Sequence, residues 1–296
     1  MHIWVSDYYK NLFGTKVYKL SFDAGCTCPN RDGTKGTRGC IFCSEQGSGE
    51  FSVPFEDFKI PERFKGADTF IAYFQNYTNT YGDLNELSKK WHKALSYDCI
   101  KGLAVATRPD CVGDDVISEL AKISEKHFVQ LELGLQTTNE KSAEYIRRGF
   151  LNADYFDAVA RIHKQVPGIH VVTHIIFGLP GETQEDMMNT VRAAVEAATD
   201  GIKITCLYVL RGTDLAAEYE QKKIEVLEMA EYFELLRKAL PLIPDSVIIH
   251  RLTGDPPKAT LIAPKWTEDK KRVMDAVKKL SLLNTKPVVP EPKWGP

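Results

Sequence analysis

Three cysteines lie in one glycine-rich loop, and they are the residues of this 296-residue chain whose spacing points most clearly to chemistry. Cys28, Cys40 and Cys43 follow an alternating, strand-like run that ends at Asp23. Thiolates this close together either hold a metal centre or cross-link, and glycines let a loop fold tightly around an inorganic group. Seven cysteines is an odd number, and together with the absence of a recognisable signal peptide it favours a metal or catalytic role over a disulfide framework.

Three kinds of site are open for this loop. The pair Cys40 and Cys43 has a spacing shared by redox dithiols, zinc sites and iron–sulfur proteins. A redox dithiol would open a helix in a thioredoxin-like unit, which the surrounding sequence does not resemble. A structural zinc site needs a fourth ligand, for which Cys26 is the candidate. A four-iron cluster on three thiolates would leave one iron open to a cofactor or substrate.

The elements that must position this loop alternate between strand-length apolar runs and stretches of helical periodicity. This alternation predicts an α/β fold with parallel strands. We expect helix starts at Asp83, Asp114 and Thr183, with Asn139 as a further candidate. The expected strands are 16–23, 69–74, 102–107, 128–134, 170–177, 202–209 and 247–250, and the expected helices are 84–95, 114–126, 140–147, 153–165, 184–198 and 224–240.

Ligands of such sheets bind at the carboxyl ends of the strands, so the cysteine loop is expected on that face. We predict one main unit over residues 1–263, including a cluster loop at 24–49. Residues 264–296 are expected to form an appendage, a charged helix at 268–283 followed by a proline-rich tail. The net charge of −2 neither favours nor excludes a nucleic-acid partner. A membrane-length apolar run is absent from the sequence, and we expect a cytoplasmic protein.

Several motifs carry a resemblance to a known family. The cysteine loop resembles the cluster loop of radical S-adenosylmethionine (SAM) proteins of the YhcC/YtqA (MnmL-type) group, and parts of the strands also resemble the radical domain of the Elongator catalytic subunit. The matching segments include Cys28-Pro-Asn-Arg-Asp-Gly-Thr34, Gly39-Cys-Ile-Phe-Cys-Ser44, Ala106-Thr-Arg-Pro-Asp-Cys111, Glu132-Leu-Gly-Leu-Gln-Thr137, His174-Ile-Ile-Phe-Gly-Leu-Pro180 and His250-Arg-Leu-Thr-Gly-Asp255.

The resemblance implies a partial (β/α)6 radical SAM barrel with a short C-terminal helical extension. It implies a 4Fe-4S cluster on Cys28, Cys40 and Cys43, with Cys26 as a spectator. S-adenosyl-L-methionine would be cleaved reductively to a 5′-deoxyadenosyl radical, with an electron from a donor such as flavodoxin or ferredoxin.

Roles for the cofactor-binding residues follow from the same resemblance. Phe42 matches the aromatic residue that borders the adenine, Gln136 the ribose-binding glutamine, and Arg148 the arginine that binds the carboxylate of the methionine part. The common Gly-Gly-Glu motif is replaced here, and Gln75 is the candidate to hold the amino group. Lys203 matches a lysine near the cofactor, whereas the roles of His174 and Cys111 stay open.

The substrate is expected at the same mouth. His250 and Arg251, with Asp255, are predicted to offer it a titratable group, a fixed cation and a carboxylate. The YhcC/YtqA resemblance implies a tRNA substrate, whose wobble uridine would be taken from the carboxymethylaminomethyl form toward the aminomethyl or methylaminomethyl form.

An RNA partner needs stacking surfaces and positive charge. Candidates are the aromatic residues Tyr73, Tyr77 and Tyr81 and the basic residues Arg31, Lys35 and Arg38. Two alternatives remain at this point: a radical SAM enzyme acting on a peptide or small metabolite, and a zinc-stabilised, non-catalytic RNA-binding protein.

Overall fold

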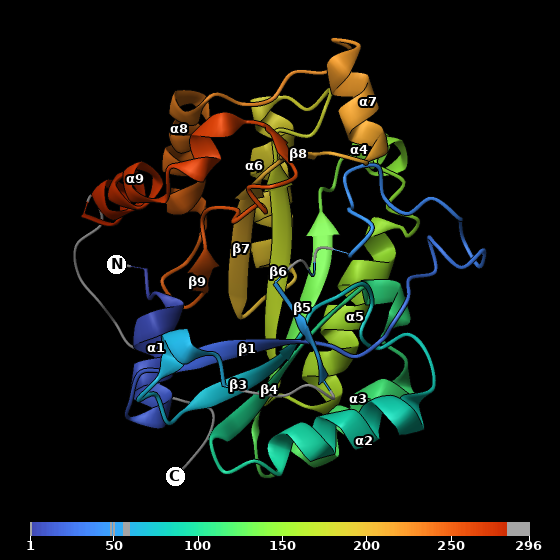
Figure 1. Ribbon diagram of the computed structural model, residues 1–296, viewed down its shortest axis with the longest axis vertical. Helices are drawn as coiled ribbons and strands as arrows, with labels where there is room; N and C mark the ends of the chain where they lie inside the picture. Colours follow the sequence, from blue (N-terminus) through green and yellow to red (C-terminus); the bar gives the residue numbers. More distant parts are fainter. Residues whose placement is uncertain (1, 48, 50, 56–59, 283–296) are drawn as a thin grey trace.

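A parallel eight-stranded sheet forms the frame of the molecule (Figure 1). The computed structural model describes residues 2–47, 49, 51–55 and 60–282. The strand order is β2-β1-β3-β4-β5-β6-β7-β9. The strands are β1 (Tyr18–Asp23), β2 (Val53–Pro54), β3 (Phe70–Phe74), β4 (Ile100–Thr107), β5 (Phe128–Gln136), β6 (His170–Phe177), β7 (Gly201–Cys206) and β9 (Ile248–Arg251).

The central strands are buried along almost their whole length because both faces of the sheet are covered. All five residues of β3 are buried, and β4, β5 and β6 are nearly as buried. In Figure 1 the sheet curves from β1 and β3, which cross the view, to the upright β5, β6 and β7. It remains open between β2 and β9, so the predicted α/β partial barrel is confirmed.

Helices cover the outer face, and most of them begin where the sequence predicted. The side chain of Asp83 accepts a hydrogen bond from the backbone amide of Asn85, and that of Thr183 accepts one from the amide of Asp186. The side chain of Asn139 accepts hydrogen bonds from the amides of Lys141 and Ser142. The helices are α1 (Val5–Phe13), α2 (Leu84–Leu95), α3 (Asp114–Ser124), α4 (Glu140–Tyr145), α5 (Asn152–Gln165), α6 (Gln184–Glu196), α7 (Asp214–Glu220), α8 (Met229–Ala239) and α9 (Lys270–Leu282).

Three expectations are wrong in detail. Asp114 lies in the first turn of α3, and Gly113 occupies the capping position. The strand expected at 202–209 ends at Cys206, and a short strand β8 (Val209–Leu210) then pairs antiparallel with β10 (Leu261–Ala263). The helix expected at 224–240 starts only at Met229, because the apolar residues before it pack as an irregular segment in a second core cluster that includes Ile224.

Helix α1 fills the end of the barrel at which the strands begin, which is the lower end in the following description. It has no counterpart among the predicted elements. Its Tyr9 is buried, donates a hydrogen bond of 2.6 Å to Oε1 of Gln130, and packs edge-on against Phe128. The barrel is therefore closed below by aromatic side chains, and its open end is the carboxyl end of the strands.

The C-terminal helix predicted for 268–283 is α9, and the proline-rich tail from residue 283 lies outside the described residues. The boundary between a main unit and an appendage at 263/264 stays a prediction. None of the helices in the described part of the chain is both long and apolar enough to cross a membrane.

Candidate active site

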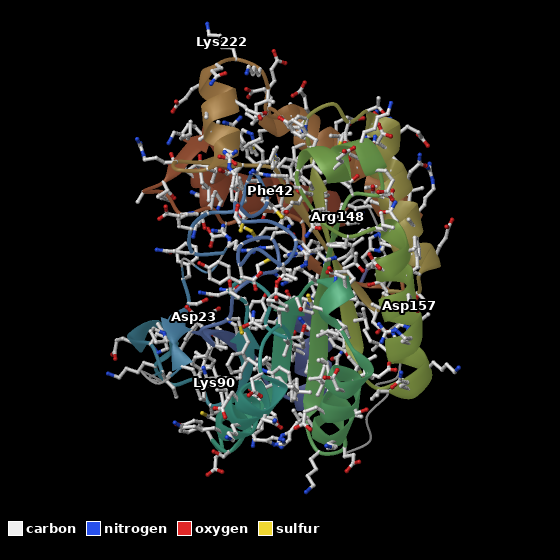
Figure 2. The ribbon with its side chains drawn as sticks, turned by 90° about the vertical axis from the view of Figure 1, so that its right-hand side faces the viewer. Asp23, Phe42, Lys90, Arg148, Asp157 and Lys222 are labelled. Atoms are coloured by element: carbon white, nitrogen blue, oxygen red, sulfur yellow. The ribbon has the colours of Figure 1, made fainter. Side chains whose placement is uncertain are left out.

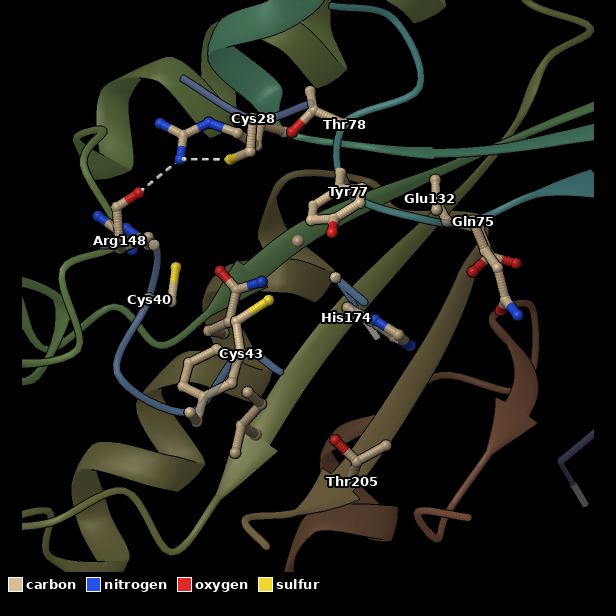
Figure 3. Close-up of a pocket in the computed structure, with 18 of the residues that line it drawn as sticks. Cys28, Cys40, Cys43, Gln75, Tyr77, Thr78, Glu132, Arg148, His174 and Thr205 are labelled. Carbon is tan, nitrogen blue, oxygen red and sulfur yellow. Dashed lines mark hydrogen bonds between the residues drawn. The ribbon is translucent and has the colours of Figure 1, made fainter. Parts of the chain in front are cut away.

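One cavity of about 280 Å³ opens at the carboxyl ends of the strands (Figure 3). The cysteine loop forms one wall, and the rest includes residues from β3, β4, β5, β6, β7 and β9 and from the segment between α4 and α5. Cys28, Cys40 and Cys43 all line this cavity. Figure 3 shows these cysteines on one side, with His174, Glu132 and Gln75 across from them. The expected convergence of the loop with the strand ends is therefore observed.

The fourth candidate cysteine takes no part in this wall. Cys26 lies outside the cavity and packs against the main core, where burial raises the pKa of its thiol to about 11. All cysteines of the chain are free thiols. Within the described residues, no group of three His, Cys, Asp or Glu side chains is arranged to hold one metal ion. Cys28, Cys40 and Cys43 thus line one cavity, whereas Cys26, the candidate fourth zinc ligand, does not line it.

Hydrogen bonds fix the shape of the cysteine loop. The Asn30 side chain donates to the carbonyls of Arg147, at 2.7 Å, and Arg148, at 3.1 Å, which ties the loop to the segment after α4. Arg31 donates to the carbonyls of Cys43, at 3.1 Å, and Ser44, at 2.6 Å. The loop is therefore held at both ends of the cysteine run before any cofactor is considered.

N–H groups also point at the sulfur atoms. Nδ2 of Asn30 lies 3.6 Å from Sγ of Cys40, and Nη1 of Arg108 lies 4.0 Å from Sγ of Cys28. Burial, with Cys43 and Cys28 nearby, raises the pKa of Cys40 to about 12. A bound cationic centre would reverse this effect and take up the thiolates, and the N–H donors would then stabilise their charge. The residues present fit an iron–sulfur cluster on three thiolates.

The floor of the cavity holds a buried carboxylate shared by two lysines. Glu132 accepts hydrogen bonds from Lys19, at 2.9 Å, from the hydroxyl of Tyr73, at 2.6 Å, and from Lys203. Burial alone would raise the pKa of Glu132, but Lys19 and Lys203 outweigh it and hold that pKa well below its usual range. Burial lowers the pKa of Lys203 to about 7. The floor is therefore charged and rigidly paired, which is unusual for the inside of a barrel.

The predicted cofactor residues all line the cavity: Phe42, Gln75, Gln136, Arg148 and Lys203. Gln75 donates to Ser52 at 3.0 Å, and Gln136 adopts a left-handed backbone conformation with φ of 61°. Figure 2 shows Phe42 and Arg148 close together inside the molecule, below Lys222 at the top of the view and above Lys90 in its lower half. Their roles toward a cofactor stay predictions.

Arg148 is almost fully buried, and its guanidinium is engaged inside the protein. It donates to the carbonyls of Phe150 and Thr137 and to Oδ1 of Asn152, over 2.6–3.0 Å. These contacts shape the end of β5 and the segment before α5. A bond to the carboxylate of S-adenosylmethionine would have to compete with them.

The expected placement of His250 is wrong. A bulge makes Arg251, and not His250, align with Lys203 of β7, so Arg251 lines the cavity. His250 lies deeper in the barrel, with its Nε2 2.8 Å from Nε2 of His170 and its ring against Tyr9. Asp255 is outside the cavity and pairs with Lys270 at 2.8 Å.

The tyrosines and basic residues predicted to contact RNA do not all lie at the opening of the cavity. Tyr73 is buried on the floor, whereas Tyr77 lines the cavity beneath Arg31 and Tyr81 contacts Thr34 outside it. Among the basic residues, Lys35 pairs with Asp110 at 2.7 Å and Arg38 with Asp214 at 2.5 Å. Acidic partners therefore offset much of the charge expected at the mouth.

Sequence reasoning missed Glu132, Lys19 and Arg108 as site residues. A signal was present, because Glu132 is the one charged residue of a buried strand, and a buried charge often marks a functional site. Arg108 follows β4 directly, at the edge where ligands bind.

Comparisons with known proteins identify the family of this chain. The radical SAM superfamily profile matches residues 32–194, and the Radical_SAM C-terminal domain profile matches residues 199–281. YtqA of Bacillus subtilis is 40% identical over 277 residues, covering 90% of this chain and 85% of that protein. YhcC of Escherichia coli is 35% identical over 264 residues, covering 87% of this chain and 85% of that protein.

Two more distant similarities concern a tRNA-modifying enzyme and a solved structure. A tRNA-2-methylthio-N(6)-dimethylallyladenosine synthase of Fusobacterium nucleatum is 29% identical over 204 residues, covering 62% of this chain and 46% of that protein. Among solved structures, Elp3 of Methanocaldococcus infernus superposes with a TM-score of 0.63 at 16% identity, covering 89% of this chain and 63% of that chain. The latter similarity concerns the fold.

Members of the matched superfamily use a 4Fe-4S cluster and S-adenosylmethionine, which the three cysteines and the adjoining cavity fit. This assignment sets aside the alternative of a zinc-stabilised, non-catalytic protein. The chain belongs to the radical SAM superfamily and is a radical SAM enzyme related to YtqA and YhcC.

Proposed function

We propose that this enzyme modifies the wobble uridine of a tRNA, converting its carboxymethylaminomethyl substituent to the aminomethyl form. In the balanced overall reaction, S-adenosylmethionine and water are consumed, and methionine, 5′-deoxyadenosine and glyoxylate are released with the modified tRNA. The carbon–nitrogen bond to the carboxymethyl group is broken. The carbon that leaves as the aldehyde of glyoxylate is oxidised, and S-adenosylmethionine is the oxidant.

The observation that carries the proposal is that one cavity joins the cysteine wall to a polar floor. Cys40 and Cys43 line one side, and Glu132, Lys203 and Arg251 line the other. A radical reaction needs positioning and exclusion of water more than it needs a particular acid or base. A polar, charged substituent on a base that reaches into the barrel would fit such a floor better than an apolar group would.

The relatives support a tRNA substrate. The synthase of Fusobacterium nucleatum bears a tRNA-modifying activity in its name, and its similarity covers 62% of this chain. The resemblance of the cysteine loop to the YhcC/YtqA group implies the wobble uridine. A peptide or a small metabolite is the alternative substrate, because the cavity by itself does not require a nucleic acid.

The proposed roles are divided by position. Cys28, Cys40 and Cys43 would hold the cluster, which supplies the electron that cleaves S-adenosylmethionine. Phe42, Gln75, Gln136 and Arg148 would bind the cofactor, and Lys203 would fix Glu132 near it. Tyr77, with its ring under Arg31, is the aromatic residue best placed to contact a base at the mouth.

The proposal is tested with protein purified without oxygen and reconstituted with iron and sulfide. A chemical reductant, S-adenosylmethionine and tRNA carrying carboxymethylaminomethyluridine are added, and nucleosides are analysed by mass spectrometry. We expect loss of the carboxymethyl group together with release of 5′-deoxyadenosine and glyoxylate. Cys43→Ala should abolish these products, whereas Cys26→Ser, in the same loop but outside the cavity, should retain them.

Two results would contradict the proposal. Release of 5′-deoxyadenosine without any change in this tRNA would direct the search to a peptide or small metabolite. Loss of the cluster in Cys26→Ser would show that the ligand set is assigned wrongly.

A further inference from the structure

Three polar residues stand next to one another across the strands that form the cavity floor. His174 of β6 is in register with Lys203 of β7, and Lys203 is in register with Arg251 of β9. Neighbouring strands lie about 4.8 Å apart, so side chains in register on one face are direct neighbours. All of these residues line the cavity. We name His174, Lys203 and Arg251 the polar row.

Arg251 is the uncommitted cation of this row. Within the described part of the chain, no hydrogen bond or ion pair engages its guanidinium. The other arginines of the cavity have protein partners: Arg31 the carbonyls of its own loop, Arg108 the carboxylate of Asp110, and Arg148 several carbonyls. The guanidinium of Arg251 is thus available to a ligand.

The row also carries more positive charge than the protein neutralises. Among the described residues that line the cavity, Glu132 is the one carboxylate, and it is already shared by Lys19 and Lys203. Lys203 and Arg251 are in register on neighbouring parallel strands, and the positive charge of Arg251 disfavours the charged form of Lys203. An anion bound between them would remove this repulsion.

His174 adds an unsatisfied polar atom. Its Nε2 is buried and has no hydrogen-bond partner among the described residues. Burial, with Lys203 nearby, lowers the pKa of His174 to about 3, so the ring is neutral at physiological pH. A neutral imidazole can donate one hydrogen bond to an anion or accept one from a ligand N–H.

We infer that the polar row binds a carboxylate of the substrate, with the guanidinium of Arg251 as its main partner. The inference rests on the proposed function, in which the carboxylate belongs to the carboxymethylaminomethyl substituent of the uridine. A guanidinium matches a carboxylate with two parallel hydrogen bonds, and a site built this way discriminates against a substrate that lacks the group. The row would thereby select the substituted uridine over the aminomethyl product.

The test uses the reconstituted enzyme with S-adenosylmethionine and without reductant, so that binding is measured without turnover. Dissociation constants are compared for tRNA carrying carboxymethylaminomethyluridine and for the same tRNA carrying aminomethyluridine, at one salt concentration. The wild-type enzyme should prefer the first by about tenfold to a hundredfold. Arg251→Gln should reduce this preference to near one, and Arg251→Lys should keep part of it.

The matched control is Arg237→Gln, an exposed arginine of α8 that pairs with Glu234 at 2.6 Å. It should leave both constants unchanged. Iron content and thermal unfolding of each variant show whether it folds and holds its cluster. If Arg251→Gln does not fold or does not hold its cluster, the comparison is made with Arg251→Lys.

The outcomes separate the inference from the function on which it rests. If the wild-type enzyme modifies the tRNA and Arg251→Gln retains the preference, the inference is wrong and the function stands. If Arg251→Gln weakens binding of S-adenosylmethionine instead, the guanidinium serves the carboxylate of the cofactor and the inference is wrong. If the wild-type enzyme, given a reductant, does not modify tRNA carrying carboxymethylaminomethyluridine, the proposed function fails and the inference fails with it.

Discussion

Glu132 is the residue on which the charge balance of the site depends. It lies inside the barrel, where removing a carboxylate from water ordinarily destabilises the fold. Two lysines and a tyrosine hydroxyl bind this carboxylate and offset the loss of hydration. The arrangement holds Lys203 in place beside Arg251 and keeps Tyr73 pointing inward. One buried carboxylate therefore connects the stability of the barrel to the shape of the cavity.

Replacing Glu132 with glutamine should destabilise the protein strongly. The substitution leaves Lys19 and Lys203 without a counter-charge in a buried place, and we expect a loss of about 3–5 kcal/mol in the free energy of unfolding. Urea denaturation measures it. Glu234→Gln, which breaks an exposed and solvent-screened pair with Arg237, should leave the free energy of unfolding almost unchanged. Equal losses in the two variants would show that Glu132 is not structurally important.

Site residues were predictable where their type and spacing carried the signal. The three cysteines, and residues that end a strand such as Gln136 and Arg251, were placed on the cavity by their position in the chain together with the family resemblance. His250 was misplaced because a bulge in β9 shifts the alternation by one residue, and neither composition nor periodicity reveals a bulge. The role of Glu132 depends on Tyr73, Lys203 and Lys19, which lie 59, 71 and 113 residues away in the chain.

At the scale of elements, the cysteine loop depends on its contact with the segment between α4 and α5. Asn30 bridges the two, and Gly149 lies directly against it with a backbone φ of 76°. A Cβ on Gly149 would come within 2.4 Å of Oδ1 of Asn30. The close approach requires a glycine for reasons of both space and conformation.

Gly149→Ala should therefore lower both stability and cluster content. The matched control is Gly212→Ala, because Gly212 has a similar φ of 83° but no atom within 4 Å of an added Cβ. The control should cost only the penalty of the left-handed conformation, about 1–2 kcal/mol, and should keep its iron. Iron per chain after reconstitution is the measurement, and equal iron content in the two variants would contradict the role given to this contact.

The loop between β6 and α6 carries a pH-sensitive contact. Burial raises the pKa of Glu182 to about 7, and this side chain accepts a hydrogen bond from Thr137 at the end of β5. In the unfolded chain the pKa is about 4.3, so the folded state binds more protons between these values. Stability contributed by the protonated form is therefore present at low pH and is lost as pH rises toward about 7.

Glu182→Gln should match the wild type at pH about 4 and be more stable at pH about 8, by about 1–2 kcal/mol. The midpoint of thermal unfolding, measured across this pH range, tests the difference. Glu185→Gln, an exposed neighbour paired with Arg192 at 2.7 Å, should show no such gain at high pH. A parallel gain in both variants would point to overall charge and not to Glu182.

Elements were predictable where one pattern governed a long segment, as in β3 to β6 and in the helices that begin at Asp83 and Thr183 caps. The pattern failed where apolar residues pack without regular structure. Ile224 belongs to a second core cluster that also contains Ile41 of the cysteine loop, and long-range packing of this kind leaves no periodic trace. Helix α1 was missed because its buried face is met by residues from the far strands.

At the scale of the whole molecule, the open sheet and α1 define a barrel that is closed below and open above. The cysteine wall and the polar row face each other across the open end, and the row is formed by the last strands of the sheet. A substrate that enters from the mouth meets the proposed cofactor site on one side and the free guanidinium of Arg251 on the other. An electron donor such as flavodoxin or ferredoxin remains the predicted partner for reduction.

The most direct measurement follows a hydrogen atom from substrate to product. The reconstituted enzyme is given S-adenosylmethionine, a reductant and tRNA whose carboxymethylaminomethyl substituent carries deuterium on the carboxymethyl carbon. We predict that the 5′-deoxyadenosine formed contains deuterium, and that tRNA with the aminomethyl substituent does not stimulate its formation. Unlabelled 5′-deoxyadenosine, formed at the same rate with or without this tRNA, would contradict the proposed use of the radical.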